Sequence, residues 1–270
     1  MRASAYAATV IAILLAAATA RGANEARVDC IDTTSTAGRL TAITDQAIVL
    51  SGAEGKQTIA RADTAQLVLA ESKDLSRQPG RQVVVTAAGD ELAAANVRVS
   101  DGKVRWESPL LGEVELPVAS VRTLYLPAAN QTVAAIRTHL TEMKLDAARD
   151  TLIVAKTADN WIAVEGVLKA VTADKISFRW KDSDRAIAAD TVPAVRLAAL
   201  ETPAVPSAGT VLGVDGSSLA FRSLTFADDV FVVESPTMGR RTLDARKVAA
   251  LRFRSDRVTD LGELTPTRVI

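Results

Sequence analysis

The chain has 270 residues, and its 32 basic and 32 acidic side chains give a formal net charge of zero. A chain of this length has room for about two domains. The balanced charge disfavours a protein built to bind nucleic acid, because such proteins normally carry a strongly basic surface.

The first 23 residues follow the pattern of a secretory signal peptide. Arg2 supplies a positive charge, residues 7–18 form an apolar run, and Ala18-Thr19-Ala20 is a small-x-small cleavage site. The alternative is an uncleaved anchor, but a membrane-spanning helix needs about 20 apolar residues. We expect cleavage after Ala20 or Ala23, a secreted or periplasmic protein, and no stable membrane span after cleavage.

Cys30 is the only cysteine of the chain. A single thiol cannot form an internal disulfide, although it can pair with another chain. The preceding residues, Arg27-Val28-Asp29, do not form a lipobox, which disfavours a lipid anchor. We expect Cys30 to be a half-buried side chain near a strand.

The mature chain is a tandem duplication. Glu107-Ser108-Pro109 recurs as Glu234-Ser235-Pro236, 127 residues later, within a long alignment that needs no gap. Residues 27–127 and 150–254 are therefore expected to form two homologous halves, each holding two smaller units. Residues 128–149 connect the halves and residues 255–270 form a tail. We expect the two units of one half to pack on each other, because each has a small core.

Alternating apolar residues predict strands throughout both halves. Ile176, Phe178 and Trp180 alternate with polar residues, and so do Val104 and Trp106. Residues 162–170 suggest a longer strand that bends at Gly166. Each unit therefore reads as about five short strands, and closing such a unit into a small barrel removes its exposed edges.

One motif resembles a known class of barrel. Gly38-Arg39-Leu40-Thr41-Ala42-Ile43-Thr44 matches residues 166–172, and both resemble the bent second strand of SH3-like and Sm-like barrels. The resemblance implies an all-β fold of tandem small five-stranded SH3/Sm-like barrels, with four units in two duplicated pairs.

A single helix is predicted between the halves. Val133, Ile136, Leu140 and Met143 are spaced by 3, 4 and 3 residues, the period of an amphipathic helix. Thr132 can cap the N-terminus of this helix.

The sequence contains no catalytic or metal-binding motif. His139 is the only histidine, and we expect it to be solvated on the polar side of the predicted helix. Together with a lone cysteine, it cannot form a zinc site of the usual kind, so no metal or cofactor is expected. Acidic residues such as Asp101, Glu107 and Asp228 are expected in turns and on solvated strand faces.

Trp161 and Trp180 are the only candidate ligand-binding residues. Their counterparts in the first half are Thr33 and Gly52, so the shared core does not require a tryptophan at either position. An exposed indole can stack on the apolar face of a sugar ring. The favoured alternative is that Trp180 continues the buried face of Ile176 and Phe178.

The tail has a second resemblance. Residues 257–266 resemble a connector in large exported bacterial proteins, where β-rich repeats precede a carbohydrate-binding module of the NPCBM type. The Glu-Ser-Pro-x-x-Gly stretches at Glu107 and Glu234 resemble the same repeat region. The module itself would lie beyond Ile270, so no sugar-binding residue can be assigned from this resemblance.

Three functions remain open from the sequence. The first is a non-enzymatic structural or interaction protein of the cell envelope, whose partner is an envelope protein or a glycan. The second is a carbohydrate-associated binding protein. The third and least favoured is a hydrolase, since glycosidases need only two carboxylates.

Overall fold

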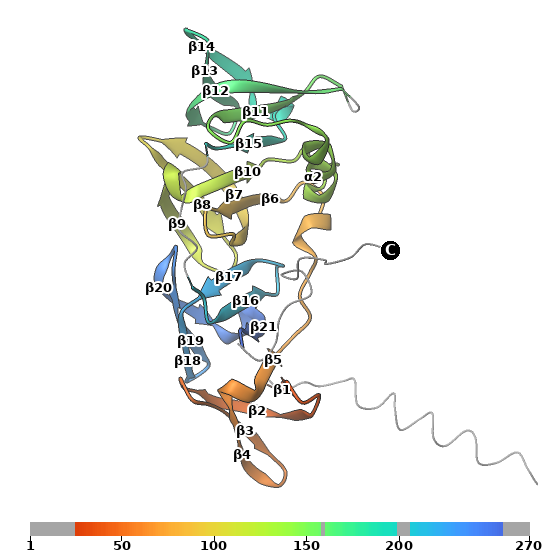
Figure 1. Ribbon diagram of the computed structural model, residues 1–270, viewed down its shortest axis with the longest axis vertical. Coiled ribbons are helices and arrows are strands. Elements are labelled where there is room, and N and C mark those ends of the chain that lie inside the picture. The colour runs from red at the N-terminus through yellow and green to blue at the C-terminus, as the bar shows by residue number, and fades with distance from the viewer. Residues whose placement is uncertain (1–24, 158–159, 199–205, 256–270) are drawn as a thin grey trace, which may run out of the picture.

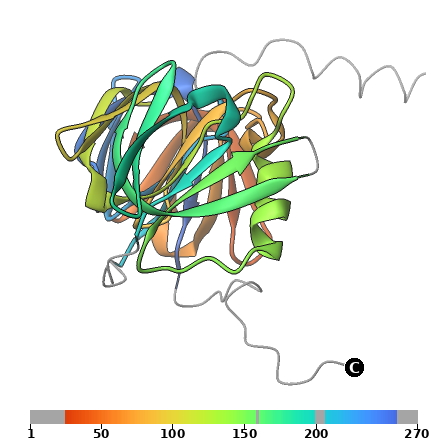
Figure 2. The same ribbon diagram turned by 90° about the horizontal axis from the view of Figure 1, so that it is seen from above.

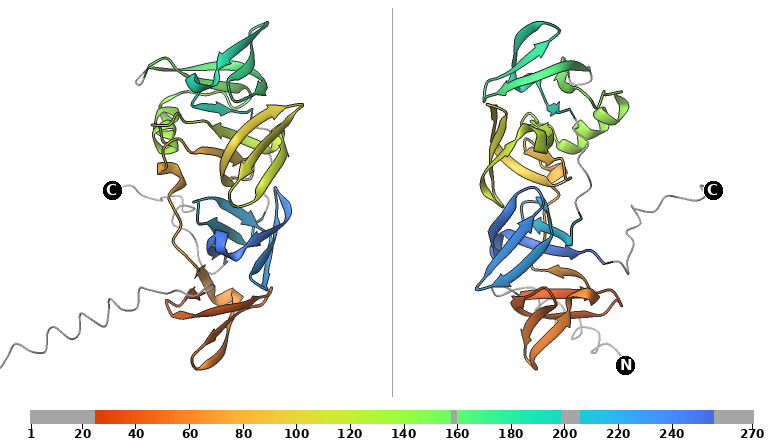
Figure 3. Two further views of the ribbon diagram at one scale, coloured as in Figure 1. Left: turned by 180° about the vertical axis from the view of Figure 1, so that it is seen from behind. Right: turned by 60° about the vertical axis from the view of Figure 1, so that its left-hand side comes forward.

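The computed structural model describes residues 25–157, 160–198 and 206–255. This part of the chain forms an all-β protein with one α-helix, and four five-stranded units follow one another along the long axis (Figure 1). We call these the first (25–68), second (82–125), third (150–196) and fourth (209–253) units. Figure 2 shows the stack of units from above, and Figure 3 shows it from two further sides. The proposed signal peptide lies outside the described residues.

The strands of the first two units alternate with short turns. In the first unit they are β1 (Glu25–Cys30), β2 (Ser35–Ile43), β3 (Ala47–Gly52), β4 (Gly55–Ala60) and β5 (Thr64–Val68). In the second unit they are β6 (Gln82–Thr86), β7 (Glu91–Ser100), β8 (Lys103–Ser108), β9 (Gly112–Pro117) and β10 (Val121–Tyr125).

The third and fourth units repeat this pattern. The third unit holds β11 (Asp150–Ala155), β12 (Trp161–Val171), β13 (Lys175–Trp180), β14 (Ser183–Ala188) and β15 (Ala194–Arg196). The fourth unit holds β16 (Gly209–Gly213), β17 (Ser218–Phe221), β18 (Ser223–Ala227), β19 (Val230–Ser235), β20 (Gly239–Asp244) and β21 (Val248–Phe253), with its second strand split into β17 and β18.

All four units share one pairing scheme. Consecutive strands pair antiparallel up to the fourth, and the first strand also pairs with the last, as β1 does with β5. A short 3-10 turn precedes the last strand of each unit, at Arg61–Asp63, Val118–Ser120, Ala189–Thr191 and Ala245–Lys247. The predicted alternation is confirmed, because Ile176, Phe178 and Val104 are each fully buried.

The units pair across the two halves, so the expectation that the units of one half pack together is wrong. The last strand of the first unit pairs with the last strand of the fourth, with Leu67 opposite Leu251. The last strands of the second and third units pair in the same way, with Leu124 opposite Val195. Along the stack the order is therefore first, fourth, second, third (Figure 1).

This arrangement has an approximate two-fold axis between the second and fourth units. Ile43 pairs with Phe226 in the first–fourth pair, and the corresponding Val171 pairs with Val99 in the third–second pair. At the centre, β7 meets β17 with Glu91 opposite Ser218, two residues that are themselves 127 positions apart. Each pair of units therefore contains one unit from each half of the chain.

Two buried polar side chains join the halves at this axis. The Asp90 Oδ1 atom accepts a hydrogen bond from the Ala220 N–H at 2.8 Å. Reciprocally, the Ser217 Oγ atom accepts one from the Ala93 N–H at 2.9 Å. Asp90 and Ser217 occupy equivalent positions of the duplication, so the two bonds are related by the approximate axis.

The repeated Glu-Ser-Pro motif forms the turn between the third and fourth strands of the inner units. The Ser108 hydroxyl accepts from the Leu111 N–H at 3.4 Å, and Ser235 accepts from the Met238 N–H at 3.3 Å. These turns place Leu110 and Met238 in the buried core. The first and third units have shorter turns at this place and no such apolar residue.

The predicted helix is confirmed as α2 (Val133–Glu142). The Thr132 side chain accepts from the Ala135 N–H at 3.2 Å, which caps the helix as expected. Val133 and Ile136 are fully buried in a second core, which lies on the outer face of the second and third units (Figure 3). Met143 follows the last helical residue and is half-buried.

Candidate functional site

Trp180 lies at the tip of the hairpin formed by β13 and β14, opposite Ser183. Its side chain is 43% exposed, so the favoured alternative, that it continues the buried face, is wrong. The alternation of buried and exposed residues along β13 ends at Phe178, since Arg179 and Trp180 are both exposed. The Lys181 Nζ atom lies 4.9 Å from the centre of the indole ring, within the range of a cation–π contact.

A surface groove of about 1040 Å³ surrounds Trp180. Val167, on the neighbouring strand β12, also lines it and is 46% exposed. Val167 and Trp180 are the exposed large hydrophobic side chains of the described residues, and both face this one groove. An apolar surface surrounded by polar groups is typical of a binding site.

Charged side chains of both signs also line the groove. The Arg179 Nε atom lies 2.8 Å from the Asp184 Oδ1 atom, and this hydrogen bond holds the pKa of Asp184 below its ordinary value. Asp150 is satisfied by the backbone, since its two carboxylate oxygens accept from the Leu168 and Ala198 N–H groups at 2.8 Å each. Glu165 and Asp182 are exposed on the rim of the groove and can accept hydrogen bonds from a ligand.

The other units do not repeat this aromatic residue. The positions that correspond to Trp180 in the hairpins of the first, second and fourth units hold Gly52, Ser108 and Ser235. Ser108 and Ser235 are buried, while Gly52 has no side chain. The groove with its exposed indole is therefore a property of the third unit and not of the shared fold.

Trp161 is not part of this groove. It is half-buried against the core under α2, and its ring stacks on His139 with the two centroids 4.3 Å apart. His139 is therefore half-buried, which corrects the expectation of a solvated side chain. The structure does not bring the two candidate tryptophans together. Trp161 is the first residue of β12, whereas Trp180 is the last residue of β13.

The two tryptophans are expected to contribute differently to stability. Trp161→Ala removes a half-buried ring that packs on α2, so we expect the free energy of unfolding to fall by about 2 kcal/mol, somewhat below the cost for a fully buried ring. Trp180→Ala removes an exposed ring and should change it by less than about 0.5 kcal/mol. Urea denaturation of both variants checks this; equal losses would contradict the assignment.

The remaining candidate residues lie where they were expected. Cys30 is the last residue of β1 and is half-buried with a free thiol. Asp101 and Asp228 are turn residues with positive φ angles of 53° and 51°. Glu107 is exposed on β8 and accepts from the Asn96 Nδ2 atom at 3.1 Å.

Two features are absent from the described part of the chain. Within it, no three or more histidine, cysteine, aspartate or glutamate side chains gather closely enough to hold a metal ion. Over the same residues, no helix is long and apolar enough to cross a membrane.

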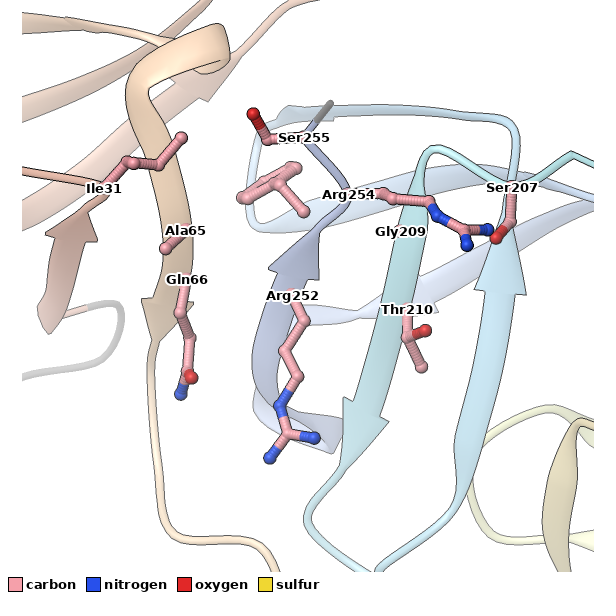
Figure 4. Close-up of a pocket in the computed structure, with 10 residues that line it drawn as sticks. Ile31, Ala65, Gln66, Ser207, Gly209, Thr210, Arg252, Arg254 and Ser255 are labelled. Atoms are coloured by element: carbon pink, nitrogen blue, oxygen red, sulfur yellow. The ribbon is translucent and has the colours of Figure 1, made fainter. Parts of the chain in front are cut away.

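A second pocket, of about 590 Å³, lies between the first and fourth units (Figure 4). Gln66 of β5, Arg252 of β21 and Thr210 of β16 come from three adjacent strands, and Arg254 and Ser207 lie at its far end. No sequence motif identified this pocket, because its residues come from both ends of the described chain.

Comparison with protein-family models gives no match for this chain. Comparison with curated proteins likewise gives no match.

Proposed function

We propose that this chain is a non-enzymatic interaction protein of the cell envelope, built from four SH3-like barrels, and that the groove around Trp180 is its binding surface. The observation that carries this proposal is that Val167 and Trp180 line one groove while staying in contact with solvent. Burying an exposed aromatic ring of this kind is a main source of binding energy at interfaces.

The pairing scheme supports the barrel assignment. Four strands in sequence, a 3-10 turn and a last strand that returns to the first are the connectivity of an SH3-like barrel. The long second strand also bends as such barrels require, since β12 pairs with β11 as far as Gly166 and with β13 from Val167 onward. The signal-peptide pattern of residues 1–23 supports the part of the proposal that concerns export to the envelope.

The proposal predicts that binding depends on the exposed indole. Wild-type protein and Trp180→Ala would be immobilised and exposed to an envelope extract, and retained proteins identified by mass spectrometry. We expect at least one partner whose retention falls about tenfold or more in Trp180→Ala, as truncation of an interface hot spot costs about 2 kcal/mol.

Lys56→Ala provides the matched control, because Lys56 is exposed on the equivalent hairpin of the first unit. Its retained proteins should match those of the wild type. Identical retention by wild type and Trp180→Ala would contradict the proposal.

A glycan ligand is the second candidate function. Trp180 offers an apolar face for a sugar ring, while Glu165 and Asp182 lie in the same groove to accept hydrogen bonds from hydroxyl groups. The resemblance of the tail to connectors that precede carbohydrate-binding modules favours the same class of ligand.

Fluorescence distinguishes this candidate from a protein partner. Trp106 is buried and Trp161 is stacked on His139, so a bound sugar should change mainly the emission of Trp180. We expect soluble peptidoglycan fragments to change the emission of the wild type but not of Trp180→Phe. An equal change in both proteins would rule out a sugar stacked on this indole.

A further inference from the structure

Each of the two pairs of units has an equivalent outer sheet face. It is made by the first and last strands of the two units in the pair. In the third–second pair, a row across this face consists of Ile153, Ala194, Tyr125 and Val83, joined by direct pairing in the order β11, β15, β10 and β6. All four side chains are buried in the core that α2 covers. This copy of the face is thus closed by the chain itself.

The same row in the first–fourth pair is polar. Asp29 pairs with Gln66, Gln66 with Arg252 and Arg252 with Thr210, in the corresponding order β1, β5, β21 and β16. Arg252 is exposed, whereas its counterpart Tyr125 is only 7% exposed. The approximate two-fold axis therefore relates a closed apolar face to an open polar one.

Two arginines, Arg252 and Arg254, line the pocket on this face, and the other described residues that line it are not acidic. Asp29, the nearest carboxylate of the row, accepts from the Ser35 hydroxyl at 2.8 Å and lies 3.0 Å from the Arg27 Nε atom.

Arg252 lies in the middle of this row. Figure 4 shows its side chain on the strand between those that carry Gln66 and Thr210. A guanidinium group binds carboxylate and phosphate groups with two parallel hydrogen bonds. The amide of Gln66 and the hydroxyl of Thr210 can each donate one more.

We propose that this pocket binds an oxyanion, a carboxylate or phosphate group carried by a small molecule or by the end of a polymer. Arg252 supplies the charge and the paired donors, while Gln66 and Thr210 complete the coordination of the oxygens. The volume of about 590 Å³ lies in the range of small-molecule sites. The site is independent of the Trp180 groove, because it lies on the other pair of units.

The test titrates the full chain with inorganic phosphate and, separately, with glucuronate, which carries its carboxylate on a sugar. Calorimetry of the wild type should give saturable binding of at least one probe, and the tighter of the two identifies the source of the oxyanion. Arg252→Ala should weaken that binding about tenfold or more, since loss of a charged hydrogen-bond pair exceeds 1.4 kcal/mol. Arg252→Lys keeps the charge and loses the paired geometry, so its affinity should lie between those of the wild type and Arg252→Ala.

Arg39→Ala is the matched control, because Arg39 is an exposed arginine on β2 of the first unit, which contributes Gln66 to the pocket, and Arg39 itself lies outside the pocket. Its affinity should equal that of the wild type, and circular dichroism would verify that all variants remain folded. Gln66→Leu gives a second variant, with an expected loss of several-fold. Equal losses of affinity in Arg39→Ala and Arg252→Ala would overturn the proposal. So would a failure of both probes to show saturable binding, even when titrated to concentrations well above millimolar.

Discussion

Gly166→Ala is expected to lower the free energy of unfolding by about 3 kcal/mol, near the upper limit usual for overpacking. A Cβ atom at this position would overlap the carbonyl oxygen of Arg179 and lie 2.5 Å from a ring carbon of Phe178. Neither neighbour can move away easily, because Arg179 is paired in the ladder and Phe178 is fully buried. Urea denaturation followed by circular dichroism measures the loss.

Gly52→Ala is the control for this prediction. Gly52 ends β3 in the equivalent unit, and a Cβ atom added there would meet no other atom within 4 Å. Its stability should equal that of the wild type within about 0.5 kcal/mol. If Gly166→Ala proved as stable as Gly52→Ala, that result would contradict the close approach of Gly166 to Arg179 and Phe178.

Asp90→Ala is expected to have an effect of similar size, about 3 kcal/mol, because hydrogen bonds to a buried charged group are among the costliest to remove. The Asp90 side chain is 2% exposed and accepts from the Thr86 hydroxyl at 2.9 Å as well as from the Ala220 N–H. Its removal leaves that N–H, which belongs to the other half of the chain, without a partner. Chemical denaturation of the variant gives the size of the effect.

Ser217→Ala removes the reciprocal bond and should cost less, about 1 kcal/mol, because the lost acceptor is neutral. Ser217 and Asp90 lie at the same junction, so the double variant should depart from the sum of the single effects. A loss below about 0.5 kcal/mol for Asp90→Ala would be typical of an ordinary surface substitution. That result would contradict a dry, hydrogen-bonded contact between the second and fourth units.

Much of the fold could be predicted from local sequence patterns. The alternation around Ile176 indicates a strand with one buried face. The spacing of Val133 and Ile136 indicates a helix with one buried face. Gly166 marked a bend because only a residue without a side chain fits where β12 approaches Arg179 and Phe178 of β13 so closely. These features depend on neighbours close in the sequence, which is why they were recognisable.

The choice of partner between units could not be predicted in this way. Leu67 of β5 and Leu251 of β21 are both fully buried leucines in the last strand of a unit, and Leu124 of β10 is a third. Any two of these strands could pair equally well by pattern alone. The pairing depends on the path of the segments that connect the units. In one such segment, between the first and second units, the Ser72 hydroxyl donates to the Gly213 carbonyl of the fourth unit at 2.7 Å.

The site was only partly predictable for a related reason. Comparison of the two halves indicated only that the shared fold does not require a tryptophan at position 180, and it did not predict that the ring is exposed. A signal for the polar pocket was present in the aligned copies, where Tyr125 corresponds to Arg252 and Val83 to Thr210. This signal can be interpreted only once Tyr125 and Val83 are known to lie side by side under α2 in the third–second pair.

The exchange of units between the halves can be tested most directly by disulfide cross-linking in a Cys30→Ser background. Gln66 and Arg252 are directly opposed on β5 and β21, so their Cα atoms lie within the range that a disulfide can bridge. The double variant Gln66→Cys with Arg252→Cys should form an intramolecular disulfide on mild oxidation, detected by its mobility on a non-reducing gel. Gln66→Cys with Tyr125→Cys should form none. Cross-linking of the second pair and not the first would mean that units of the same half pair with each other, contrary to the structure described above.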